Sequence, residues 1–160
     1  MRKTVTKVIS VFILIACLIP LKTAISGTVD SEKYSKIIWN YLETLCAFGP
    51  RNPGSEGYRE TIELIRRVGK KYADQVVEHP FQVQISEQKK IRMVNLELQF
   101  AGTKGGAPIL IGSHFDTRPF ADQETDPEKQ IQPIIGANDG GSSTALLLGL
   151  AHYLFQHPPP

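Results

Sequence analysis

The sequence predicts an α/β fold, in which a mixed sheet has antiparallel edge strands, central parallel strands and helices on both faces. Three observations lead to this fold class. Two amphipathic helical segments come first, and two segments that alternate every second residue follow them. A short run that is apolar on both faces then precedes a nearly all-apolar helical segment. With 160 residues, 41% of them hydrophobic, the chain is expected to build one core.

The first helix is expected over residues 30–48. Asp30 or Ser31 is placed to cap its N-terminus, and Gly49 followed by Pro50 ends it. The apolar positions at helical spacing are Tyr34, Ile37, Ile38, Tyr41, Leu42 and Leu45.

A second helix follows a loop rich in proline and glycine. We expect it to begin at Ser55 or Glu56 and to end near Tyr72. Its expected buried stripe is Tyr58, Ile62, Ile65, Val68 and Tyr72.

The pattern then changes to strands. Residues 81–85 and 94–100 alternate apolar and polar side chains, which is typical of half-exposed antiparallel strands. Residues 108–112 are apolar on both faces and predict a central strand covered by helices. Functional residues commonly lie where such a strand ends.

A polar loop over residues 117–134 comes next, and its four acidic residues indicate a solvated surface more than a metal cage. The glycine-rich segment 136–141 then opens a helix from Thr144 to about Gln156, which is apolar enough to be buried on all sides. A unit of this kind needs further parallel strands. We therefore expect the chain to be truncated, the N-terminal part of a larger domain.

The first residues resemble an export signal. Basic residues are followed by an apolar run from Val8 through Leu21, shorter than a membrane-spanning helix requires. We expect a signal peptide at residues 1–26 and a mature domain at 27–160. Cleavage before Cys17 with lipid attachment is the alternative. Both interpretations predict an exported protein, secreted or periplasmic, whose contact with a membrane is limited to the signal peptide or a lipid anchor on Cys17.

The remaining composition excludes some functions. The 18 basic and 16 acidic residues are interspersed, for a net charge of +2, so no nucleic-acid partner is expected. Beyond the leader only Cys46 remains, and its helical setting predicts a small buried residue. No phosphate loop, dinucleotide fingerprint or nucleophile elbow is present.

Three residues are candidates for chemistry. His114 and Asp116 follow the apolar run, and residues two apart in extended backbone face the same side. They suit a metal or catalytic pair, or alternatively a surface ion pair. Asp139 precedes a predicted helix whose dipole favours its ionised form, the form that zinc requires. A simple helix cap is the alternative role for Asp139.

Three segments in this order resemble the glutaminyl-peptide cyclotransferase and zinc aminopeptidase family. They are FGPRNPGS at residues 48–55, GSHFDTR at 112–118 and GAND at 136–139. Each is weak alone, but their order, on a loop, a strand end and a helix start, makes the resemblance specific. The stretch DTRPFA at residues 116–121 is more similar to the cyclotransferase branch.

The resemblance implies a zinc ion held by an aspartate, a glutamate and a histidine, with another glutamate as general acid and base. Asp139 matches the aspartate. His114 matches a residue that binds a second zinc in the aminopeptidases and no zinc in the cyclases, and Asp116 matches the orienting carboxylate beside it. The other groups, including the general acid/base, lie in the family on segments beyond Gln156 and are not in this chain. Ser143 departs from the aminopeptidase pattern, which has glycine there.

The implied function is conversion of the N-terminal glutamine of a peptide or protein into pyroglutamate, with release of ammonia. The first alternative is a zinc aminopeptidase that hydrolyses N-terminal residues. The second is an inactive, truncated peptide-binding protein. Because zinc sites need at least three protein ligands, little activity is expected from these residues by themselves.

Overall fold

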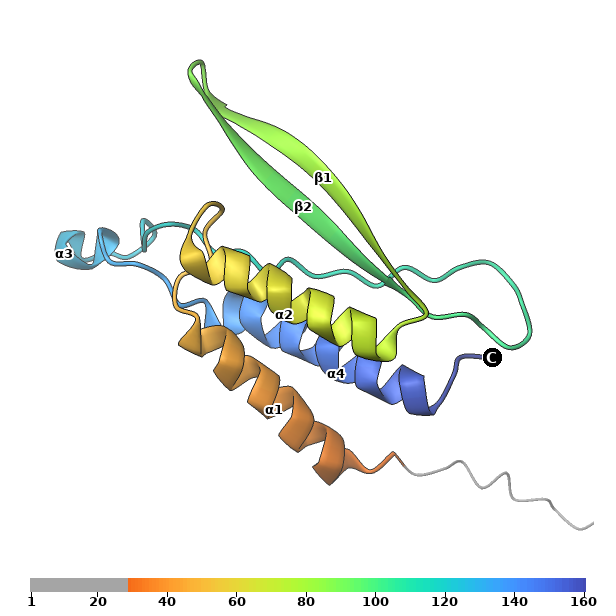
Figure 1. Cartoon of the computed structure of the whole chain (residues 1–160). Helices are drawn as coiled ribbons and strands as arrows, with labels where there is room; N and C mark the ends of the chain where they lie inside the picture. The colour runs from red at the N-terminus through yellow and green to blue at the C-terminus, as the bar shows by residue number, and fades with distance from the viewer. Residues whose placement is uncertain (1–28) are drawn as a thin grey trace, which may run out of the picture.

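A computed structural model describes residues 29–160, so the predicted signal peptide, its cleavage sites and Cys17 lie outside the described residues. The elements are, in chain order, α1 (Ser31–Ala47), α2 (Glu56–Tyr72), β1 (Gln75–Ser86), β2 (Lys89–Gln99), the single turn α3 (Pro127–Gln130), the irregular turn η1 (Ala137–Ser142) and α4 (Ser143–Gln156). Figure 1 shows the three long helices packed beside each other, with the β1–β2 hairpin rising away from α2. In the described part of the chain, no helix is long and apolar enough to span a membrane.

The first two helices confirm the predicted boundaries, because local side chains fix their ends. Asp30 caps α1 by accepting a hydrogen bond from the Lys33 amide at 3.0 Å. Ser55 caps α2 by accepting from the Tyr58 amide at 3.1 Å, and its hydroxyl also donates to the Pro50 carbonyl at 2.9 Å. The α2 cap thus ties the preceding loop to the start of the helix.

The core lies where α4 packs against both α1 and α2. Its central residues are Leu45, Leu64, Ile65, Val68, Ala145, Leu148 and Ala151. Gly149 lets α1 and α4 approach closely, because a Cβ there would lie 2.4 Å from Cγ1 of Ile38. The predicted α2 stripe is confirmed at Tyr58, Ile65 and Val68, while Ile62 and Tyr72 are half-buried. Cys46 is also half-buried.

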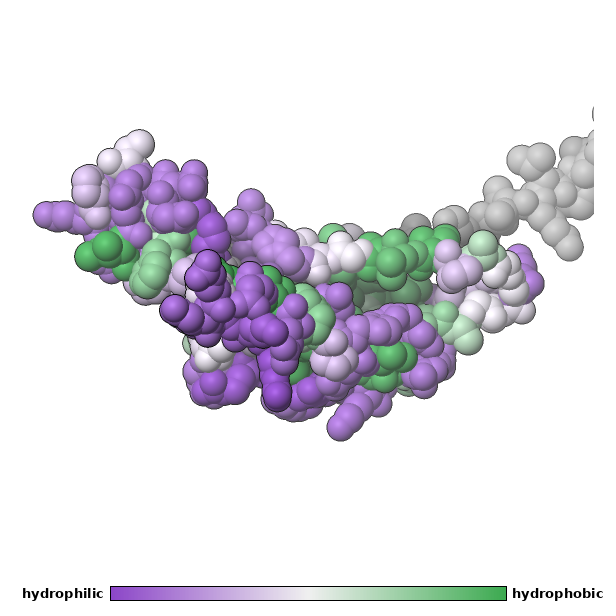
Figure 2. Space-filling model, turned by 90° about the horizontal axis from the view of Figure 1, so that it is seen from above, coloured by the Kyte–Doolittle hydropathy of each residue, from purple (hydrophilic) through white to green (hydrophobic). Residues whose placement is uncertain are grey.

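The expectation that α4 is buried on all sides is wrong. Leu146 and Phe155 are 55% and 59% exposed. The reason is that, within the described residues, α1 and α2 are the long helices packed against α4, and they leave more than half of Leu146 and of Phe155 uncovered. On the side seen in Figure 2, apolar surface is likewise open to solvent between polar regions.

The two predicted edge strands are confirmed as an antiparallel hairpin. Gln75 pairs with Gln99 at the base and Gln84 with Lys90 near the tip. Leu96 and Leu98 of β2 pack against the core, whereas most of β1 is exposed. β2 therefore has a half-buried face, as the alternation predicts, whereas residues 81–85 of β1 are exposed on both faces, which the alternation does not predict.

The prediction of a central strand at residues 108–112 is wrong. Residues 108–112 form no strand, and Ile109, Leu110 and Ile111 are exposed by 89%, 88% and 61%. A strand needs a hydrogen-bonded neighbour, and the β1–β2 hairpin is the whole sheet within residues 29–160. The fold is mixed α/β, but central parallel strands are not formed by these residues.

The surroundings of His152 predict that the stability of the helical core depends on pH. Its ring stacks on Tyr72 with centroids 4.6 Å apart and meets the edge of Tyr34 at 6.0 Å. Burial lowers the pKa of His152, and the positive charges of Lys33 and Lys71 lower it further. The unfolded chain therefore binds a proton more readily, so stability is complete above the unfolded pKa, about 6.5, and falls as the pH drops below it.

We expect the melting temperature of the wild-type chain to fall between about pH 7.5 and about pH 5.5, and to fall less in His152→Gln. Thermal melts followed by circular dichroism measure this difference. His157→Gln, an exposed histidine one turn further along the chain, is the matched control and should behave like wild type. Equal pH dependence in wild type and His152→Gln would contradict the prediction.

Candidate functional site

The structure brings the three predicted site residues together. His114 lies between two carboxylates, with its Nε2 3.1 Å from Oδ1 of Asp139 and its Nδ1 3.5 Å from Oδ1 of Asp116. The same Nδ1 lies 3.1 Å from the backbone oxygen of Asp116. The imidazole therefore joins the segment after residue 112 to the turn η1, two segments that are separated in sequence by the acidic loop.

Glycine at position 140 makes this arrangement sterically possible. Asp139 (φ −78°, ψ 98°) and Gly140 (φ 85°, ψ −33°) have non-helical backbone, so the chain bends sharply inside η1. A Cβ on Gly140 would lie 3.1 Å from both Cε1 and Nδ1 of His114. The imidazole thus packs directly on the backbone of Gly140, and the carboxylate of Asp139 faces its Nε2.

Asp139 does not cap the following helix, so this alternative prediction is wrong. Helix α4 begins at Ser143, and the residue that flanks its start, Ser142, bonds instead to the carbonyl and side-chain oxygens of Asn138, each at 3.0 Å. The Asp139 side chain is 75% exposed. Within the described residues His114 is its one polar partner, which leaves carboxylate oxygen free for a ligand.

The first turn of α4 holds the His114 segment in place. The Thr144 hydroxyl donates to the His114 carbonyl at 3.0 Å, and the hydroxyls of Ser113 and Ser143 lie 2.6 Å apart. Ser143, at the position where the aminopeptidase pattern has glycine, therefore contacts the segment that carries His114.

Sequence reasoning missed Arg51, which is completely buried beside the site. Its guanidinium donates to the carbonyls of Phe115 (2.8 Å), Leu45 (3.2 Å), Ile135 (2.7 Å) and Gly136 (2.8 Å). Burial lowers the pKa of Arg51, and the nearby Cys46 and Asp116 raise it. The available signal was a single arginine inside a loop of prolines and glycines, which does not by itself distinguish a buried side chain from a solvated one.

The described residues do not form a zinc site by themselves. No three histidine, cysteine, aspartate or glutamate side chains converge in residues 29–160 so as to hold a metal. His114 and Asp139 offer two ligands at most, and a protein zinc site uses at least three. In the acidic loop, Asp122 pairs with Arg118 and Asp126 caps α3.

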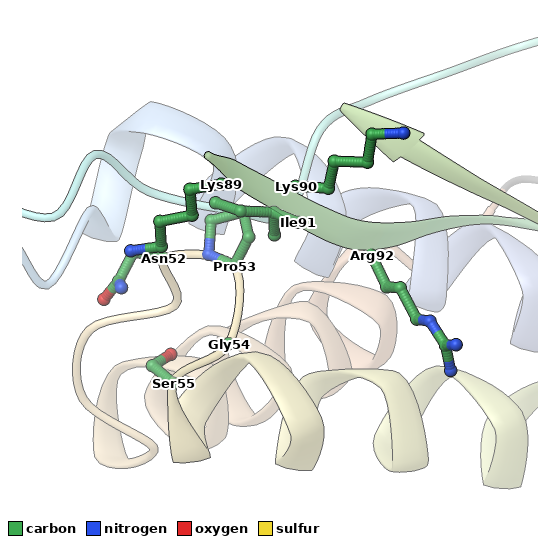
Figure 3. Close-up of a pocket in the computed structure, with 8 residues that line it drawn as sticks. All are labelled: Asn52, Pro53, Gly54, Ser55, Lys89, Lys90, Ile91 and Arg92. Atoms are coloured by element: carbon green, nitrogen blue, oxygen red, sulfur yellow. The ribbon is translucent and has the colours of Figure 1, made fainter. Parts of the chain in front are cut away.

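A separate open hollow lies between the loop before α2 and the tip of the hairpin (Figure 3). Residues Asn52–Ser55 and Lys89–Arg92 line it, and in Figure 3 the side chain of Lys90 points away from the helices. This hollow is basic and contains no carboxylate or imidazole. It is not part of the histidine and aspartate cluster.

Comparison with known proteins agrees with the three-motif resemblance. Residues 95–160 match the sequence profile of Peptidase family M28, and none of the curated proteins matches the sequence. Among solved structures, Fimbriiglobus ruber glutaminyl cyclase is 32% identical over 74% of this chain, with a TM-score of 0.68. Tannerella forsythia glutaminyl cyclase is 26% identical over 78% of the chain, with a TM-score of 0.71.

A zinc-dependent exopeptidase from Parabacteroides distasonis is also similar, at 25% identity over 78% of the chain and a TM-score of 0.70. These similarities confirm the resemblance to glutaminyl cyclases and zinc exopeptidases over about three quarters of this chain. The chain spans 39% of the Fimbriiglobus structure, 42% of the Parabacteroides structure and 43% of the Tannerella structure.

Proposed function

We propose that this chain, which shares its fold with bacterial glutaminyl cyclases and zinc exopeptidases, belongs to an exported, zinc-dependent glutaminyl-peptide cyclotransferase. The observation that carries the proposal is Asp139, an exposed carboxylate in a sharp turn before α4 that faces His114 at 3.1 Å. The glutaminyl cyclases of Fimbriiglobus ruber and Tannerella forsythia support it by their similarity, as do the DTRPFA residues after His114.

In this proposal each residue of the cluster has one role. Asp139 is one of the zinc ligands, and the sharp bend at Gly140 sets the direction of its carboxylate. Asp116 lies beside Nδ1 of His114 and fixes the direction of the imidazole, as carboxylates do next to metal-site histidines. The remaining zinc ligands and the general acid/base must come from residues outside this cluster.

The substrate is a peptide or protein whose N-terminal residue is glutamine. Its α-amine attacks the side-chain amide carbon and the ring closes; the proton that this amine loses is passed to the amide nitrogen, whose bond to carbon breaks as it leaves as ammonia. The product has the same number of residues as the substrate, which separates this reaction from hydrolysis.

Aminopeptidase activity is the second candidate, and one observation favours it. Nε2 of His114 faces the carboxylate of Asp139. In an aminopeptidase, a second metal ion would bind between these two groups. The match to Peptidase family M28 and the Parabacteroides exopeptidase structure are consistent with it.

Product analysis separates these functions. The intact protein that the gene encodes is incubated with a glutamine-leading peptide, and ammonia and peptide mass are followed against a protein-free control. We expect ammonia release with all residues retained, and loss of the reaction after zinc is removed with a chelator. Release of a free amino acid would overturn the cyclase proposal in favour of the aminopeptidase. Peptide binding without any product would overturn both in favour of a binding protein.

A further inference from the structure

We propose that Arg51 is the positioning residue that holds His114 and Asp139 face to face. The inference rests on the proposed function for its relevance to catalysis, because it concerns the same cluster. The buried side chain of Arg51 connects the two segments on which His114 and Asp139 lie.

The guanidinium contacts both segments from the protein interior. On the His114 side, Nε donates to the Phe115 carbonyl at 2.8 Å. On the Asp139 side, Nη1 donates to the Ile135 carbonyl at 2.7 Å, and Nη2 donates to the Gly136 carbonyl at 2.8 Å. Because the donors of a guanidinium are fixed in one plane, these bonds define the relative position of the two segments.

The Arg51 backbone strengthens the same connection. Its amide donates to the Thr117 hydroxyl at 3.0 Å, and the Thr117 amide donates to its carbonyl at 3.3 Å. Residues 115–117 are thus bonded to Arg51 through both side chain and main chain. A Cβ at Gly136 would lie 3.2 Å from Nη2 of Arg51, so the glycine allows the guanidinium its close approach.

The energetic consequence follows from burial. Arg51 is completely buried, and its hydrogen bonds to these carbonyls are charge-assisted in an environment without competing water. Lysine keeps the charge but has a compact ammonium group, which cannot reproduce the spread of the four bonds. Arg51→Lys should therefore loosen the two segments relative to each other while retaining a buried cation.

The contact between His114 and Gly140 provides a direct test. Since Cε1 of His114 packs on the backbone of Gly140, its proton should give a nuclear Overhauser effect to the Gly140 α protons. We expect this signal in the wild-type chain and its loss in Arg51→Lys. The stacked rings of Tyr72 and His152, 4.6 Å apart, give a control signal that should persist in both and report an intact helical core.

Thr144→Val supplies the matched comparison, because it removes a hydrogen bond to the same segment that does not involve Arg51, from the Thr144 hydroxyl to the His114 carbonyl. The proposal predicts that the signal between His114 and Gly140 survives in Thr144→Val. Survival of the signal in Arg51→Lys together with its loss in Thr144→Val would overturn the proposal and assign positioning to Thr144. The measurement needs neither zinc nor substrate, so it can fail or succeed independently of the proposed function.

Discussion

Asp139→Asn is expected to remove zinc from the intact protein and to lower ammonia release from a glutamine-leading peptide by roughly 100-fold or more. An amide is neutral and a much weaker zinc ligand than a carboxylate, while its shape is nearly the same. The Asp139 side chain is 75% exposed, so the substitution should change the melting temperature little when the two proteins are compared without zinc. Elemental analysis and the ammonia assay measure the two effects on one preparation.

The matched control is Glu87→Gln, which makes the same carboxylate-to-amide change at the exposed tip of the hairpin. It should retain both zinc and activity. Zinc retained at full occupancy in Asp139→Asn would show that the carboxylate in η1 is not a ligand. The assignment of the site would then be wrong, even if the protein proved to be a cyclase.

Gly136→Ala is expected to lower the free energy of unfolding by about 2 to 5 kcal/mol. Gly136 has φ 62°, a left-handed conformation that costs alanine about 1 to 2 kcal/mol. In addition, a Cβ there would lie 2.4 Å from Cγ2 of Thr117 and 2.8 Å from the Asp139 carbonyl oxygen. Overpacking of this kind typically costs about 1 to 3 kcal/mol. Urea denaturation measures the sum.

Gly105→Ala separates the two costs. Gly105 has a similar φ of 70°, but a Cβ there meets no atom within 4 Å. Gly105→Ala should therefore lower the free energy of unfolding only by the conformational cost, about 1 to 2 kcal/mol. Equal destabilisation by the two substitutions would mean that the contacts of Gly136 with Thr117 and Asp139 do not constrain the site.

The helices were predictable because their signals are local. Asp30 and Ser55 cap α1 and α2 through amides three residues away, and the prolines and glycines between the helices mark the loop. The hairpin was predictable for the same reason, since alternation within each strand is visible without knowing its partner. The helices agree with the structure to within a residue or two, whereas β1 and β2 begin six and five residues before the expected segments.

The central strand was not predictable in the same way. The apolar run at residues 108–112 has the composition of a buried strand, but burial depends on neighbouring strands that residues 29–160 do not supply. Likewise, the composition of α4 indicates burial on all sides, whereas Leu146 remains exposed because no element within residues 29–160 covers it. Sequence pattern reports what a segment is suited to, and its surroundings decide whether that is realised.

The candidate site also contains residues that the sequence reveals and one that it does not. His114, Asp116 and Asp139 could be identified from their positions after an apolar run and before a helix, and the structure places them together. Arg51 could not, because its partners are backbone carbonyls from three segments and no side-chain pattern records them. The residue that organises the cluster therefore becomes visible only in three dimensions.

The number of zinc ions bound by the intact protein tests the central claim most directly. Elemental analysis of the protein that the gene encodes is expected to give one zinc per chain, held in part by Asp139 and lost together with ammonia release when a chelator is added. Two zinc ions per chain would contradict the single-zinc cyclase and support the aminopeptidase. A folded protein that binds no zinc would contradict both enzymes.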